Sequence, residues 1–273
     1  MKARAVFFVS DRTAITAEAL GSSLLAQFPA VTLIRHTLRF IDTPAKAEEA
    51  AHRIRVARAE TDAPPLIFST LIDPGIREVV ARSGGVLFDL VHTFIHPLEQ
   101  VLGEQSSHTV GRTHGMRDLR AYGLRIEAVN FALATDDGLS PRSYAQSDVI
   151  VLGVSRSGKT PTCLYLALTF GIRAANVPLT EETLATGLLP PGLETHRAKL
   201  FGLTIDASRL QAIRAERRPD SSYASLQTCQ QEVRRAEQLF HREHIPSLPT
   251  TSVSIEEIAT SIIDAMRLER RLG

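Results

Sequence analysis

One stretch of the chain has the residue types and the spacing of a phosphate-binding loop. Residues 152–171 are LGVSRSGKTPTCLYLALTFG, where two glycines enclose four residues and lysine and threonine follow. In this Walker A pattern, backbone N–H groups surround phosphate oxygens, the lysine reaches the terminal phosphate and the threonine hydroxyl binds Mg²⁺. The predicted nucleotide-binding residues are Gly153, Val154, Ser155, Arg156, Ser157, Gly158, Lys159 and Thr160.

The flanking sequence favours the same interpretation. It predicts a strand over 148–154 and a helix from Lys159 to Gly171. Successive N–H groups and the positive end of the helix then surround one point, where phosphate binds. We expect Lys159 to be exposed there, with its charge toward phosphate. The alternative is a plain glycine turn before a helix.

An aspartate after a second apolar strand could hold Mg²⁺ together with Thr160, as in other enzymes with this loop. The strand is predicted over 199–205, and Asp206 follows it. Asp206 could equally be only the cap of the helix that starts at 207. Arginines beyond it could neutralise phosphate charge during transfer, or only form a solvated helix face. These are Arg209, Arg214, Arg217 and Arg218.

Other polar residues have weaker claims to a role. His114, in the segment GRTHG, could transfer a proton near neutral pH, although a lone loop histidine is more often inert. Asp11 and Thr13 follow the first predicted strand, at an edge where α/β sheets bind ligands, and helix capping is the favoured alternative. The stretch TDDG (135–138) could bind metal, but a turn is favoured. His92 and His96 have zinc-like spacing, but no carboxylate completes that motif.

Composition excludes several functional classes. The net charge of +1, from 31 basic and 30 acidic residues, does not provide the basic field of a nucleic-acid-binding protein. The only cysteines, Cys163 and Cys229, form neither a disulfide framework nor a metal motif, which favours a reducing compartment. No apolar stretch is long enough for a membrane span. We therefore expect a cytoplasmic protein with neither nucleic acid nor membrane as partner.

Strand and helix signals alternate along the chain, which predicts parallel α/β sheets. The expected fold is an N-terminal Rossmann-like parallel-sheet domain followed by a C-terminal P-loop kinase-like α/β domain. The predicted boundaries are 1–103 for the first domain, 104–146 for an interdomain segment and 147–273 for the nucleotide-binding domain. No internal repeat is visible in the sequence.

Several stretches along the chain together resemble one protein family. FFVSDRTAIT, RTHG, LGVSRSGKTPTCLYLA, FGIRAANVPL, KLFGLTID, IRAERR, SYASL and SIEEIA are similar to the phosphoenolpyruvate synthase regulatory proteins, which are related to the regulators of pyruvate, phosphate dikinase. The resemblance covers nearly the whole chain. The chain departs from the family at Arg12, where glycine is common, and at Thr135, where histidine is frequent.

The resemblance implies a bifunctional enzyme. One activity phosphorylates a threonine of phosphoenolpyruvate synthase with ADP as donor and inactivates the synthase. The other removes that phosphate with inorganic phosphate and releases pyrophosphate. Lys159, Asp206 and His114 are then the catalytic candidates, and Thr160 and Asp206 the Mg²⁺ ligands. A homo-oligomer is compatible with the sequence. The alternatives are an ATP-dependent small-molecule kinase and a non-catalytic, nucleotide-gated binding module.

Overall fold

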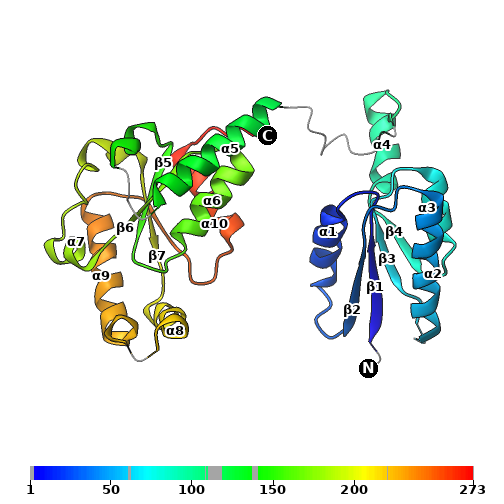
Figure 1. Cartoon of the computed structure of the whole chain (residues 1–273), viewed down its shortest axis with the longest axis horizontal. Helices are drawn as coiled ribbons and strands as arrows, with labels where there is room; N and C mark the ends of the chain where they lie inside the picture. Colours follow the sequence, from blue (N-terminus) through cyan, green and yellow to red (C-terminus); the bar gives the residue numbers. More distant parts are fainter. Residues whose placement is uncertain are drawn as a thin grey trace. The chain divides into compact units, whose positions relative to one another are not determined.

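The chain consists of two compact units, Met1–Gly115 and Met116–Gly273 (Figure 1). In a computed structural model, residues 3–60, 63–107, 109, 119–136, 141–219 and 221–272 are described. Each unit contains a four-stranded parallel sheet with helices on both faces, so the predicted pair of α/β folds is confirmed. Among the described residues, no helix is both long and apolar enough to cross a bilayer.

The first unit has the strand order β2-β1-β3-β4. Side chains alternate across β1, so that Phe8 packs with α1 on one face while Phe7 packs with α2 and α3 on the other. The elements are β1 (Arg4–Val9), α1 (Ile15–Leu25), β2 (Leu33–Leu38), α2 (Pro44–Glu60), β3 (Leu66–Ser69), α3 (Pro74–Ala81), β4 (Val86–Asp89) and α4 (His92–Leu102).

The second unit has the equivalent strand order, β6-β5-β7-β8. Its elements begin with α5 (Leu119–Ala134), the short 3-10 helix η2 (Pro141–Gln146), β5 (Val149–Gly153), α6 (Lys159–Phe170), β6 (Ala174–Pro178) and α7 (Glu181–Thr186). They continue with η3 (Glu194–Lys199), β7 (Leu200–Thr204), α8 (Ala207–Arg217), η4 (Ser222–Ala224), α9 (Leu226–Arg242), β8 (Ser247–Pro249) and α10 (Ile255–Met266).

Two apolar cores lie on the two faces of this second sheet. Ile150 and Leu152 of β5 face the core that α7, α8 and α9 cover, whereas Val149 and Val151 face the core beneath α5, α6 and α10. All of β5 is buried, which fixes the point at which the chain leaves the sheet and enters the glycine-rich loop.

The segment 104–146, predicted as interdomain, contains a helix of the second unit. α5 packs along α6, with Ala128 and Ala132 buried against Cys163 and Leu166. The short strand β8, which pairs with β7 at the edge of the sheet, was not predicted from the sequence. This strand is three residues long and ends in a proline, a residue that sheets accept at an edge.

Candidate functional site

The glycine-rich loop connects the buried strand β5 to α6, as its sequence predicts. A Cβ atom on Gly153 would lie 2.5 Å from Ser157 Oγ and 2.6 Å from the carbonyl oxygen of Leu203, so that only glycine fits. Gly158 precedes α6 with φ of 90°, a left-handed conformation that glycine adopts freely. Both glycines of the motif are therefore required by the backbone itself.

The carbonyl groups of the loop are held by donors from the protein. The Val154 carbonyl accepts from Lys159 Nζ at 2.9 Å, the Ser155 carbonyl from Arg214 at 3.1 Å and the Ser157 carbonyl from Thr250 Oγ1 at 3.3 Å. Each peptide group is planar and trans, so its N–H points away from its carbonyl. N–H groups turned away from these donors are what a phosphate-binding loop requires.

A cavity of about 670 Å³ opens beside this loop, which is a size typical of small-ligand sites. Its wall is formed by loop residues, by Pro178 at the end of β6, and by side chains of α8 and η4. Ile213 and Tyr223 supply apolar surface, while Arg217 and Arg218 bring positive charge. The cavity thus combines a phosphate cradle with a surface that can receive a nucleoside.

Lys159 is buried, with 5% of its surface exposed, so the expectation of an exposed lysine was wrong. Its ammonium group donates to the Val154 carbonyl at 2.9 Å. Lys159 nevertheless lines the cavity.

Three polar side chains meet next to Lys159. Thr160 Oγ1 donates to Asp136 Oδ1 at 3.0 Å, and Asn176 Nδ2 lies 2.9 Å from Thr160 Oγ1 and 2.5 Å from Asp136 Oδ1. Asn176 is buried in β6, and its Oδ1 has no hydrogen-bond partner among the described residues. A carboxylate and a hydroxyl are ligands that suit Mg²⁺, and the Asn176 amide nitrogen donates to both of them. This cluster therefore fits a magnesium ion bound with substrate phosphates.

Sequence reasoning missed two members of this cluster. Asp136 is the first acid of TDDG, for which a turn was favoured, and it follows α5 directly in the second unit. Asn176 was not considered. Its signal was a lone amide in the otherwise apolar strand AANVP, which pairs with β5. Within the described part of the chain, no three His, Cys, Asp or Glu side chains gather around a metal position.

Asp206 lies elsewhere in the second unit. Its carboxylate caps α8 by accepting from the N–H groups of Ser208 at 2.9 Å and Arg209 at 3.0 Å. It lines a separate hollow of about 440 Å³ with Glu237 and Thr251, and it is not among the residues that line the cavity at the loop. The structure thus brings Thr160 together with Asp136 and not with Asp206.

The four arginines after Asp206 have different surroundings. Arg217 and Arg218 line the cavity, whereas Arg209 lies in the first turn of α8 and its N–H donates to Asp206. Arg214 is fully buried and forms an ion pair with Glu232 of α9 at 2.6 Å. The solvated helix face considered from the sequence therefore does not describe Arg214.

The remaining predicted residues are not brought to this site within the described structure. His114 lies outside the described residues. Asp11 is buried after β1 and accepts from the Ile72 N–H at 3.3 Å, and burial raises the pKa of its carboxyl group. His92 and His96 face different carboxylates, Asp89 and Glu99, so they share no metal position.

Known proteins are similar to this chain over nearly its full length. A family model described as Kinase/pyrophosphorylase matches residues 6–263. A protein of Halorhodospira halophila is 55% identical over 270 residues, covering 98% of both chains. A protein of Alkalilimnicola ehrlichii is 52% identical over 269 residues, also 98% of both. One of Legionella pneumophila is 49% identical over 269 residues, 98% of this chain and 99% of the relative. All three relatives are named phosphoenolpyruvate synthase regulatory proteins.

Proposed function

Because the chain belongs to the kinase/pyrophosphorylase family, we propose that it phosphorylates a threonine of phosphoenolpyruvate synthase, with ADP as the donor. The same enzyme removes that phosphate with inorganic phosphate and releases pyrophosphate. The observation that carries the proposal is the cavity at the glycine-rich loop, where Lys159 and the pair Asp136 and Thr160 lie side by side. The relatives' names supply the protein substrate.

The geometry supports transfer of the β-phosphoryl group of ADP. The loop N–H groups and Lys159 hold the β-phosphate, while Arg217 and Arg218 lie where further phosphate charge would need neutralising. The threonine oxygen attacks the β-phosphorus, the bond to the bridging oxygen breaks, and AMP leaves. Phosphoryl transfer of this kind depends on positioning and charge neutralisation. His114 stays a prediction for the acceptor of the threonine proton.

Asp136 and Thr160, supported by Asn176, would hold Mg²⁺. When bound, the ion neutralises charge on the phosphate oxygens. We propose Asp136 as the carboxylate ligand in place of Asp206. Of these two aspartates, Asp136 is the one that contacts Thr160 and lines the same cavity in the described structure.

Both reactions use one site in this proposal. For dephosphorylation, an oxygen of inorganic phosphate attacks the phosphorus of phosphothreonine, the threonine oxygen leaves with a proton, and pyrophosphate forms. Inorganic phosphate then occupies the position of the α-phosphate of ADP. The second unit has a single loop of this type, and the two nucleophiles differ only in the nucleoside. AMP should therefore inhibit dephosphorylation competitively with inorganic phosphate.

The test is incubation of the purified chain with phosphoenolpyruvate synthase, Mg²⁺ and either ADP or ATP. We expect AMP formation from ADP, loss of synthase activity and one phosphothreonine by mass spectrometry. Subsequent addition of inorganic phosphate should restore the synthase and release pyrophosphate. Synthase incubated without the chain is the control. Turnover of a small metabolite with ATP, or nucleotide binding without any turnover, would refute the proposal in favour of the two alternatives.

A further inference from the structure

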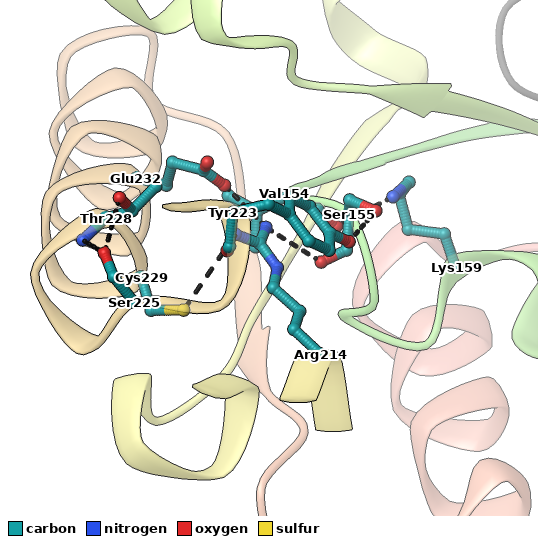
Figure 2. A network of polar contacts seen from close by, with 9 residues as sticks. All are labelled: Val154, Ser155, Lys159, Arg214, Tyr223, Ser225, Thr228, Cys229 and Glu232. Atoms are coloured by element: carbon teal, nitrogen blue, oxygen red, sulfur yellow. Dashed lines mark hydrogen bonds and ion pairs between the residues drawn. The ribbon is translucent and has the colours of Figure 1, made fainter. Parts of the chain in front are cut away.

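A partly buried polar network connects α8 and α9 to the glycine-rich loop (Figure 2). At its centre is Arg214, whose side chain is fully buried. Its Nη2 donates to Glu232 Oε2 at 2.6 Å and to the Ser155 carbonyl at 3.1 Å. Its Nη1 donates to the Tyr223 carbonyl at 3.1 Å, and the guanidinium group lies 4.1 Å from the centre of the Tyr223 ring. Tyr223 in turn contacts Ser155, since the two hydroxyl groups are 2.8 Å apart.

The guanidinium group stays charged in this buried position. Burial lowers the pKa of Arg214, but the hydrogen bond and the charge of Glu232 more than offset this effect, and the pKa is raised. A charged donor forms a stronger hydrogen bond than a neutral one. The carbonyl of Ser155 is therefore held firmly, although it belongs to a loop.

The residue after this carbonyl has a disfavoured conformation. Arg156 has a φ of 76°, in the left-handed region that residues other than glycine rarely adopt. Rotation of the Ser155–Arg156 peptide group would allow Arg156 to leave this region. That rotation would also break the hydrogen bond from Arg214, and it would reverse the direction of the Arg156 N–H.

The direction of this N–H matters for the cavity. Because the Ser155 carbonyl points toward Arg214, the Arg156 N–H points away from it. No hydrogen bond among the described residues occupies that N–H, and Arg156 lines the cavity. The observed orientation of the peptide group thus keeps a donor available for a phosphate oxygen.

We propose that Arg214 is a positioning residue that holds the Ser155–Arg156 peptide group in its phosphate-binding orientation against the preference of Arg156 for negative φ. This inference rests on the proposed function in one respect, namely that the loop binds phosphate. Arg214 acts through the loop backbone and contacts no substrate. Glu232 keeps the guanidinium group charged and aligned.

The test measures binding of ADP and of pyrophosphate, each with Mg²⁺, by calorimetry. Arg214→Lys retains a charge beside Glu232 but cannot reach Glu232 and the carbonyl groups of Ser155 and Tyr223 together. We expect both dissociation constants to rise about tenfold, which corresponds to about 1.4 kcal/mol and is on the scale of the left-handed penalty. Equal effects on the two ligands are expected, because the lost contact concerns a phosphate and not the nucleoside.

A double-mutant cycle separates positioning from general stabilisation. Glycine has no preference for negative φ. In the background Arg156→Gly, Arg214→Lys should therefore change the dissociation constants by no more than about twofold. In the matched background Arg156→Ala, which removes the same charge but keeps a Cβ atom, the tenfold loss should persist. An equal loss in both backgrounds would overturn the inference, because a purely structural role does not depend on φ at residue 156.

Thermal unfolding shows which variants are folded. If Arg214→Lys does not fold, Arg214→Met combined with Glu232→Leu serves instead, since buried ion pairs often tolerate replacement by apolar side chains of similar size. The loss of ligand affinity in this double variant should likewise disappear in the Arg156→Gly background and persist in the Arg156→Ala background. A folded variant that binds both ligands like the wild type overturns this inference alone. A wild-type chain that binds neither ligand overturns the proposed function as well.

Discussion

Replacing each of two aspartates by asparagine should separate Mg²⁺ binding from helix capping. In Asp136→Asn, an oxygen of nearly identical position can still accept from Thr160, so the fold is expected to persist. The negative charge that would face Mg²⁺ is lost. Residues that only support metal ligands already change metal affinity by about 10- to 100-fold. We expect the Mg²⁺ concentration for half-maximal rate to rise by at least this factor, which corresponds to about 1.4–2.8 kcal/mol.

Asp206→Asn is the matched control. The Asp206 carboxylate accepts from two N–H groups at the start of α8, and asparagine caps helices about as well as aspartate. Stability should therefore change by only a few tenths of a kcal/mol, and the Mg²⁺ dependence should be that of the wild type.

The assay is AMP formation from ADP in the presence of phosphoenolpyruvate synthase, followed across a Mg²⁺ titration for each variant. Thermal unfolding, recorded in parallel, verifies that both variants are folded. If Asp206→Asn shifted the titration and Asp136→Asn did not, the assignment of the carboxylate ligand would be reversed. If neither shifted it, the cluster at Thr160 would not bind the ion.

Three further perturbations have expected outcomes. Lys159→Met keeps the buried space filled, so the free energy of unfolding should fall by only about 1 kcal/mol for the lost hydrogen bond. The rate of AMP formation should fall about 10²-fold or more. A folded variant with a near-normal rate of AMP formation would contradict this. Gly153→Ala should lower the free energy of unfolding in urea by about 1–3 kcal/mol, because its Cβ would meet the fixed carbonyl of Leu203. The rate of AMP formation should also fall strongly, because the loop would be displaced. Unchanged stability would argue against the close approach of Leu203. Burial raises the pKa of the Cys163 thiol to about 12, so this thiol stays protonated at pH 8. It should resist iodoacetamide in the native chain and react in urea, as followed by mass spectrometry, and rapid native labelling would refute its burial.

Local patterns predicted the strand, the glycine-rich loop and the helix in their correct order, because the backbone at Gly153 and Gly158 demands glycine. The glycines at 153 and 158 are required by a close contact and by a left-handed φ, which are requirements of the backbone itself. The same holds for the capping box of Ser254 and Glu257, which the sequence also indicated and the structure contains.

The cluster of Asp136, Thr160 and Asn176 was not predictable in the same way, because its members come from three separate elements. Asp136 follows α5, Thr160 lies in the first turn of α6, and Asn176 is in β6. Only the pairing of β5 with β6 and the packing of α5 on α6 bring them together. The sequence pattern of an aspartate after an apolar strand pointed to Asp206, but the same position is also that of a helix cap, which is the role Asp206 has in the structure. The burial of Arg214 also depends on a distant partner, Glu232 of α9.

The two sheets have the same strand order, and their first connections also match. β1 and α1 are joined by residues 10–14, and β5 and α6 by residues 154–158, so both connections have equal length. Each ends in a left-handed residue without a side-chain cap, Ala14 in one and Gly158 in the other. The chain thus contains the same scaffold twice, a duplication of architecture that its sequence does not display. We expect only the second copy to bind phosphate, because the first connection places the buried carboxyl group of Asp11 near the start of the helix. We therefore expect one ADP to bind per chain, even though every chain contains two connections of the same length.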